Sequence, residues 1–178
     1  MALPVRAAQV RLATPADAAA LSLVGSATFL ETFANLHSAS DILAHCQRNH
    51  SAEVYSRWLA QPRAAAWLLE AQPGDAPVGY AVMAPADVPV PDPRPDDLEL
   101  KRIYLLQPFQ GGGWGRRLMD AVVERARSLG SQRLLLGVWT VNEDALRFYA
   151  RYGFTRAGER AFWIGDRQCA DHLLALAL

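Results

Sequence analysis

Four glycines within the six residues from Gln110 to Gly115 constrain the fold of this chain more than any other feature. They lie between an apolar, strand-like run, 98–106, and an amphipathic run that begins at Arg116. Glycine accepts positive φ angles and lets a ligand come close to the backbone, and the free N–H groups of a helix start attract negative charge. The order of strand, glycine turn and helix therefore indicates a phosphate site, although such a turn can also be no more than a tight connection.

The spacing of the glycines decides between classes of nucleotide. No Lys-Ser or Lys-Thr pair follows the last glycine as in an NTPase phosphate loop. A dinucleotide fingerprint that starts at Gly111 or Gly113 meets Arg116 or Leu118 where its third glycine belongs. The pattern Gln-x-x-Gly-x-Gly instead resembles the pyrophosphate loop of the acetyl-CoA-dependent N-acetyltransferases of the GNAT superfamily.

Two further segments extend this resemblance. The run from Leu136 to Phe154, with Asn142 at the start of a helix and Phe148-Tyr149 within it, is similar to the second conserved block of the superfamily. Glu99 lies eleven positions before Gln110, where many members carry a strand carboxylate that serves as a base. A narrower resemblance, to the bacterial polyamine (spermidine-type) acetyltransferases, rests on residues 31–33 and 163–166.

The resemblance implies an α/β (α+β) fold with a mixed, mostly antiparallel sheet of six or seven strands, flanked by helices and splayed between strands 4 and 5. The size of the chain and its lack of repeats predict one domain over residues 1–178. Periodicity and turn residues predict the elements. We expect helices over 14–36, from 40, from 51 to before 62, from 116 and over 142–151, and strands over 10–12, 66–71, 78–83, 98–106 and 134–139, then two more after Phe154 joined near 165–166.

Five prolines between Pro85 and Pro95 exclude a central strand there. We expect an exposed, solvated connection, with a border of the acceptor entrance as the alternative.

The resemblance assigns roles to individual residues. The pantetheine arm of acetyl-CoA would run beside the fourth strand and be held by Asn142, and the phosphates would meet the glycine loop. At about 3.3 Å per strand residue, Glu99 lies roughly 20 Å from Leu105, which leaves the acetyl group near Glu99. The expected cofactor-binding residues are Ile103, Tyr104, Leu105, Gln110, Gly111, Gly112, Gly113, Trp114, Gly115, Arg116 and Asn142.

Glu99 and Tyr149 are the expected catalytic residues. An alkylamine with a pKa near 10.4 is about 99.9% protonated at pH 7, and reaching its neutral form costs about 4 to 5 kcal/mol. Glu99 would accept that proton directly or through water, and the alternative is an ion pair with Lys101. Tyr149 stands where related enzymes protonate the departing CoA sulfur, and the alternative is a core aromatic.

Composition narrows the partners. The chain has 18 basic and 18 acidic residues, so its charge recruits neither nucleic acid nor an anionic membrane. Two isolated cysteines, with no signal peptide and no spanning segment, predict a soluble cytoplasmic protein. The histidines show no metal-ligand spacing, so we expect no metal. A homodimer is compatible with such sheets, whose exposed edges often pair.

The sequence therefore predicts direct transfer of acetyl from acetyl-CoA to a small primary amine, a polyamine such as spermidine by preference. Glu31, Asp41, Glu53, Trp163 and Asp166 are the candidates for binding a polycation. Lys101 opposes that preference, because a cation on the fourth strand repels a polycation. The alternatives are a protein or peptide acceptor, and an acetyl-CoA sensor without catalysis.

Overall fold

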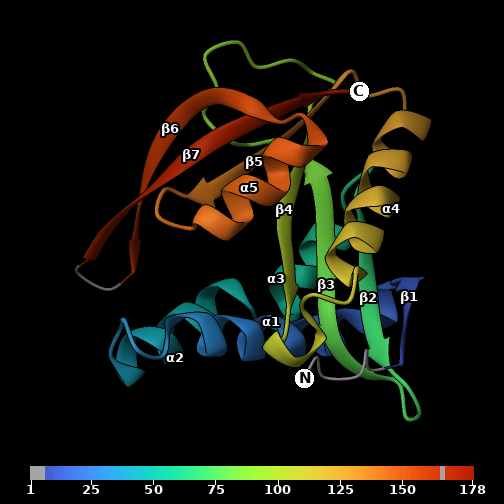
Figure 1. Ribbon diagram of the computed structural model, residues 1–178, viewed down its shortest axis with the longest axis vertical. Coiled ribbons are helices and arrows are strands. Elements are labelled where there is room, and N and C mark those ends of the chain that lie inside the picture. The colour runs from blue at the N-terminus through green and yellow to red at the C-terminus, as the bar shows by residue number, and fades with distance from the viewer. Residues whose placement is uncertain (1–6, 165–166) are drawn as a thin grey trace.

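The computed structural model describes residues 7–164 and 167–178. Seven strands form one sheet in the order β1-β2-β3-β4-β5-β7-β6 (Figure 1). The strands are β1 (Ala8–Leu12), β2 (Ala65–Ala71), β3 (Ala76–Pro85), β4 (Leu98–Leu105), β5 (Arg133–Trp139), β6 (Thr155–Ile164) and β7 (Arg167–Ala177). The helices are α1 (Ala18–Phe33), α2 (Ala39–Asn49), α3 (Ala52–Leu59), α4 (Trp114–Ser128) and α5 (Glu143–Tyr152), with short 3-10 turns at Pro15–Asp17 and Gln107–Phe109.

β4 and β5 are the parallel pair of this sheet, and they separate soon after they meet. Their register joins Leu98 to Leu134 and Glu99 to Leu135, and no further pair follows among the described residues. Both strands nevertheless continue, β4 to Leu105 and β5 to Trp139. The other neighbouring strands are antiparallel. The mixed sheet splayed between strands 4 and 5 is thus confirmed, and the facing edges of β4 and β5 keep backbone groups that the sheet does not use.

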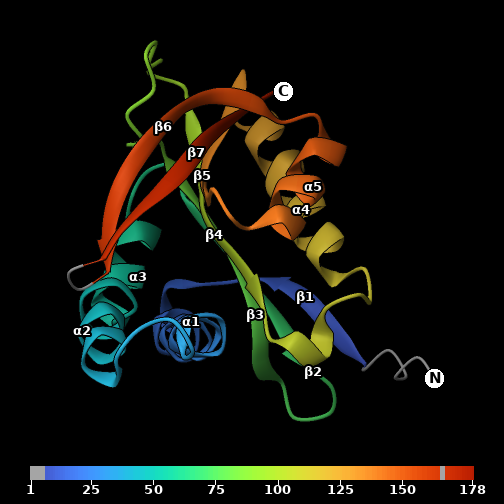
Figure 2. The same ribbon diagram turned by 60° about the vertical axis from the view of Figure 1, so that its left-hand side comes forward.

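Helices cover both faces of the sheet (Figure 2). On one face, α4 and α5 enclose the largest apolar cluster, to which β4 contributes Leu98 and Leu100 and α4 contributes Leu118 and Met119. On the other face, α1 and α3 pack on β2 and β3. Burial of apolar side chains on both faces stabilises this three-layer arrangement.

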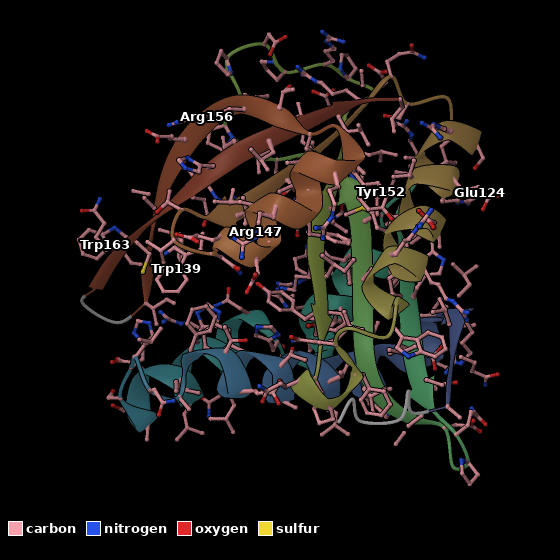
Figure 3. All side chains as sticks on the ribbon, in the orientation of Figure 1. Glu124, Trp139, Arg147, Tyr152, Arg156 and Trp163 are labelled. Atoms are coloured by element: carbon pink, nitrogen blue, oxygen red, sulfur yellow. The ribbon has the colours of Figure 1, made fainter. Side chains whose placement is uncertain are left out.

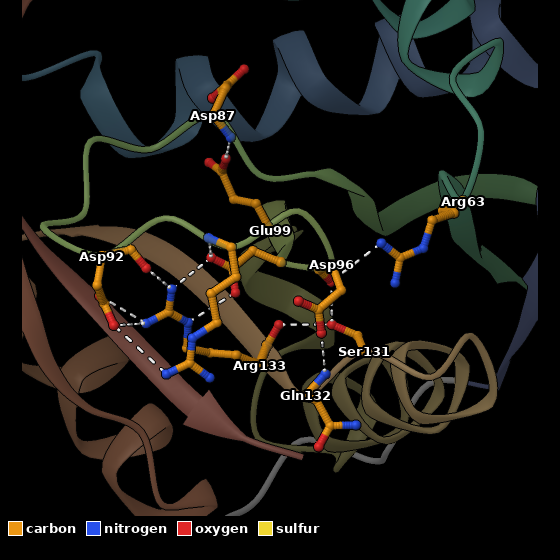
Figure 4. Close-up of polar contacts among 10 residues, drawn as sticks. Arg63, Asp87, Asp92, Asp96, Glu99, Ser131, Gln132 and Arg133 are labelled. Atoms are coloured by element: carbon orange, nitrogen blue, oxygen red, sulfur yellow. Dashed lines mark hydrogen bonds and ion pairs between the residues drawn. The ribbon is translucent and has the colours of Figure 1, made fainter.

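The connection 86–97 differs from the exposed loop that its prolines predict. Val88 and Val90 are buried against Leu135 and Leu173, so that expectation is wrong for the middle of the segment. Arg133 anchors the rest of the segment, as Figure 4 shows. The two carboxylates that it binds belong to the residues Asp92 and Asp97.

The expected helices and strands are present, with ends that shift by a few residues, and the turn at 165–166 lies outside the described residues. Among the helices of the described part of the chain, none has the length and hydropathy that crossing a bilayer requires.

Candidate active site

The glycine loop adopts the backbone that its sequence predicts. Gly111 and Gly113 have φ angles of 77° and 80°, in the region that favours glycine. Gly113 caps α4, which begins at Trp114, two residues before the expected Arg116. The first N–H groups of a helix have no partner within it, so those of 114–116 are available to an anion. The Trp114 side chain is buried in the core, and only its backbone can contribute.

Contacts fix the loop against the end of β4. The Gln110 side-chain amide donates to the carbonyl of Leu105 at 3.0 Å. A Cβ added at Gly115 would lie 3.5 Å from Leu105 Cδ1, in ordinary contact. Arg116 is exposed and lies 3.6 Å from Asp120 one turn further on. Its side chain therefore has a solvated partner whether or not a phosphate binds.

The expected pantetheine strand presents its side chains to two faces. Ile103 and Leu105 pack against the core under α4, whereas Tyr104 lies on the opposite face, with 36% of its surface exposed. Gly112 lies between the two glycines of positive φ. The backbone of 103–105 lies beyond the last β4–β5 pair, so it borders the opening between the two strands.

Glu99 is a buried carboxylate at the point where the strands part, with 4% of its surface exposed. Burial raises its pKa above the ordinary value, against the opposing effect of Lys101. Its Oε2 accepts hydrogen bonds from Lys101 Nζ at 2.6 Å and from the backbone N–H of Asp87 at 3.1 Å; Figure 4 shows the latter. Oε1 accepts none from the described residues, so one oxygen remains available to a substrate. The ion pair with Lys101 and the capacity to accept a proton thus coexist.

A β-bulge shapes β4 next to Glu99. The register passes from Val82↔Arg102 to Met83↔Leu100, which leaves Lys101 without an opposite residue. Lys101, two residues after Glu99, shares its face by ordinary alternation, and its ammonium also lies 2.7 Å from Asp87 Oδ1. A bulge places two successive side chains together, so Arg102 lies on that face as well.

Tyr149 of α5 and Asn142, the residue that caps this helix, are the two expected site residues that follow β5. Tyr149 is buried between Phe148 and Phe154, with ring centroids 5.5 and 5.6 Å away. Burial and the neighbouring Tyr104 raise its pKa, and its hydroxyl makes no hydrogen bond within 7–164 and 167–178. Asn142 caps α5 by accepting from the N–H of Ala145 at 3.1 Å. Its amide NH2 group is not used in that bond.

The acidic residues predicted to bind a polycation have local roles. Glu31 accepts from the N–H of Gln107 at 2.9 Å, Asp41 accepts from the Ser38 hydroxyl, and Glu53 lies in the first turn of α3. Trp163 is exposed on β6, as Figure 3 shows. Asp166, the last of this set, lies outside the described residues.

A polar network centred on Arg102 escaped the sequence analysis. Arg102 Nη1 lies 3.0 Å from His50 Nδ1 and 2.8 Å from the Tyr55 hydroxyl, which in turn donates to the Tyr80 hydroxyl at 3.3 Å. Burial, with Arg102 adding to it, lowers the pKa of His50 to about 2, so this imidazole is neutral. The doublet Lys101-Arg102, which interrupts the alternation of apolar and polar residues in β4, was the available signal.

Three carboxylates on the Glu99 face have cationic partners. Glu99 and Asp87 share Lys101, and Asp171 of β7 lies 3.0 Å from Arg160 of β6. A Cβ at Gly137 would come within 3.0 Å of both members of that second pair, so the glycine lets them lie directly over β5.

Two shallow cavities, of about 320 and 350 Å³, lie elsewhere, along α4. The cavity of about 320 Å³ is lined in part by Tyr152, which Figure 3 shows pointing from α5 toward α4. Neither cavity includes a residue of the candidate site.

A sheet that opens beside a glycine-rich helix start, with a buried carboxylate where the opening begins, is the arrangement that the resemblance to the GNAT superfamily implies. Residues 30–154 match the Acetyltransferase (GNAT) family. The chain belongs to that family, and relatives named N-acetyltransferase support the enzymatic class.

Individual relatives cover most of the chain. An uncharacterized N-acetyltransferase from Lactobacillus delbrueckii subsp. lactis is 33% identical over 151 residues, 85% of this chain and 86% of that protein. The spermine/spermidine N(1)-acetyltransferase of Bacillus subtilis is 31% identical over only 64 residues, 35% of this chain and 42% of that enzyme.

Solved structures share the fold. The PaiA N-acetyltransferase from Thermoplasma acidophilum, in complex with coenzyme A, superposes with a TM-score of 0.74 at 16% identity, over 97% of this chain and 99% of that one. YncA from Salmonella typhimurium, a putative acetyltransferase with its cofactor acetyl-CoA, gives 0.66 at 20% identity, over 97% and 94%.

Proposed function

We propose that this protein transfers the acetyl group of acetyl-CoA directly to a primary amine of a small molecule. The observation that carries the proposal is the position of Glu99. It lies where β4 and β5 part, upstream of a loop whose free N–H groups suit phosphate. Acetyl-CoA supplies the activated acetyl thioester. Its phosphates would meet 110–116, and its pantetheine would lie along 103–105 with Asn142.

The residues then have distinct tasks. Glu99 Oε1 would take the proton of the substrate ammonium, directly or through water. Because burial raises the pKa of Glu99, that pKa lies closer to the pKa of the ammonium. Tyr149 would donate its hydroxyl proton to the departing sulfur, and the same hydroxyl is uncommitted within the described residues. Neither Cys46 nor Cys169 belongs to the two family segments, which supports a ternary complex without an acetylated enzyme.

A polyamine acceptor is the finer hypothesis. Its support is the short match to the Bacillus subtilis enzyme and the resemblance of 31–33 and 163–166. Lys101 and Arg102 on the Glu99 face oppose it, because cations there repel a polycation.

The test is release of CoA from acetyl-CoA, followed with a thiol reagent, against spermidine, spermine, diamines, amino acids and short peptides. Saturable release with a small amine supports the proposal, and release with peptides alone would favour a protein acceptor. Calorimetric binding of acetyl-CoA without release from any amine would replace the enzyme by a sensor. Gly113→Val should abolish acetyl-CoA binding, since a β-branched residue does not accept the φ of 80° at this position. Retained binding would remove the phosphate-loop assignment.

A further inference from the structure

Arg102 lies on the acceptor side of the proposed site. Leu98 and Leu100 point into the core under α4, so Glu99 between them faces the other side of the sheet. The bulge at Lys101 brings Arg102 to that same side, where it contacts α3. Arg102 lies three residues after Glu99 along the strand, a backbone distance of about 10 Å. A small molecule with two polar groups can span that distance.

The surroundings of this guanidinium are neutral. Its hydrogen bonds go from Nη1 to His50 and Tyr55, and its carbon lies 4.8 Å from the centre of the Trp58 ring and 5.5 Å from that of Tyr55. Within 7–164 and 167–178 no carboxylate pairs with it. The aromatic rings and the imidazole attract the cation but leave its charge uncompensated.

Arg102 differs in this from the other cations on the same face. Lys101 binds Glu99 and Asp87, and Arg160 binds Asp171. An arginine withdrawn from water without an anionic partner is costly. The missing partner is what an anion arriving from outside would supply.

The guanidinium also keeps free donors. Both of its hydrogen bonds use Nη1, and neither Nε nor Nη2 donates to any residue that the structure describes. These two nitrogens form the edge that binds a carboxylate through two parallel hydrogen bonds. The guanidinium is thus held through Nη1, while Nε and Nη2 form a two-donor edge, here called the Arg102 fork, that remains free to bind an anion.

A glycine in α1 makes room for this arrangement. A Cβ at Gly25 would lie 2.1 Å from the Tyr55 hydroxyl oxygen and 2.6 Å from His50 Nδ1. These are the two groups that hold Arg102 Nη1. The helix therefore gives up a residue of higher helix propensity at the position that fixes the guanidinium.

We propose that Arg102 binds a carboxylate of the acceptor, so that the substrate class is the small amino acid, with an amine near Glu99 and a carboxylate at the Arg102 fork. This inference rests on the proposed acetyl transfer. It selects against polyamines, whose cationic chain would lie beside an uncompensated arginine.

The experiment compares matched amines that differ only in the anionic group. The series from glycine through β-alanine and 4-aminobutanoate to 6-aminohexanoate, together with the L-α-amino acids, is assayed by CoA release beside the corresponding amides and beside putrescine and spermidine. The expected result is a KM at least about tenfold lower for the best carboxylate than for its amide, the size of a charge-assisted bidentate contact. Equal or better use of the amide or of a polyamine would overturn the proposal.

Variants separate anion binding from a structural role. Arg102→Gln should erase the preference of carboxylate over amide while acetyl-CoA affinity changes little, so that the loss falls on the carboxylate acceptors. Arg102→Lys should restore the preference only in part, and Arg125→Gln, an exposed arginine of α4, is the matched control. An equal loss on every acceptor in Arg102→Gln would show that the residue only supports the fold.

Failure of acetyl transfer itself is distinguishable. If no amine is turned over, calorimetry with 4-aminobutanoate and 4-aminobutanamide decides, on the wild type and on Arg102→Gln. A preference for the carboxylate that the variant loses would support the anion site and reject the transferase, and the absence of a preference would reject the anion site.

Discussion

Replacing Gly25 by alanine sets two effects of opposite sign against each other. Alanine is favoured over glycine in a helix interior by about 1 kcal/mol. Against this, the new methyl would lie 2.1 Å from the Tyr55 hydroxyl oxygen and 2.6 Å from His50 Nδ1. Tyr55 is 0% and His50 3% exposed, so neither side chain can swing into solvent. Overpacking of this kind costs about 1 to 3 kcal/mol, and contacts this short belong at the upper end. We expect a net loss of about 1 to 2 kcal/mol.

Urea unfolding measures the effect. With a slope of about 2 kcal/mol per molar urea, in the middle of the usual range, the midpoint should fall by roughly 0.5 to 1 M. Tyr55→Phe provides the matched background, because it removes the nearest atom and leaves the ring. There the same Gly25→Ala change should cost at least about 1 kcal/mol less, although His50 still restricts the methyl. The double-mutant cycle isolates that coupling.

The reasoning is refuted if Gly25→Ala costs the same with and without the Tyr55 hydroxyl, or if it stabilises the wild type by its helix propensity alone. Either result would mean that the network around Arg102 shifts freely and does not depend on the space that glycine provides.

The site and the fold predict four further outcomes. Tyr149→Phe should lower kcat by about 10- to 1,000-fold with acetyl-CoA affinity nearly unchanged, and calorimetry beside the thiol assay checks both. Glu99→Gln should leave a rate that keeps rising with pH toward the pKa of the amine, since hydroxide must then remove the proton; an unchanged pH profile of kcat/KM would exclude the base role. Arg133→Met should cost about 3 to 5 kcal/mol in thermal unfolding, because it leaves Asp97, whose side chain is 3% exposed, without its cation. Hydrogen bonds from Arg11 hold the pKa of Asp17 below its ordinary value. Asp17→Asn should therefore lower the free energy of unfolding above about pH 4, and its difference from wild type should vanish as the pH falls toward the pKa of Asp17 in the folded state.

The sequence was sufficient for the parts of the site that depend on local backbone chemistry. The positive φ angles of Gly111 and Gly113 and the start of a helix after them follow from residue type alone. The element order follows from hydrophobic period, and the divergence of β4 from β5 came with the family resemblance.

The Arg102 network could not be predicted in the same way. Strict alternation along β4 would place Arg102 on the face of Leu98 and Leu100, under α4. One extra residue, Lys101, reverses the face of every later residue in the strand, and a bulge has no reliable sequence signature. The partners His50 and Tyr55 come from a distant helical segment, so no spacing linked them to the strand.

The prediction that the connection 86–97 is an exposed loop was wrong for a related reason. Prolines indicated that the segment cannot join a sheet ladder, which is correct, but they do not indicate whether it is solvated. Val88 and Val90 pack on β5 and β7, and Arg133, 36 residues from Asp97 in the sequence, anchors it. Long-range ion pairs of this kind leave no local pattern.

The brief pairing of β4 with β5 has a mechanical consequence. Backbone hydrogen bonds link the two half-sheets at 98–99 and 134–135, whereas one continuous apolar cluster, to which both β4 and β5 contribute, spans them. A ladder locks strands in steps of a whole residue, but apolar contacts are non-directional and tolerate small sliding. The half-sheet β1–β4 and the half-sheet β5–β7–β6 can thus rock about a short backbone pivot while their shared core stays closed. Amide exchange should report this as faster opening along the facing edges than in the antiparallel ladders on either side.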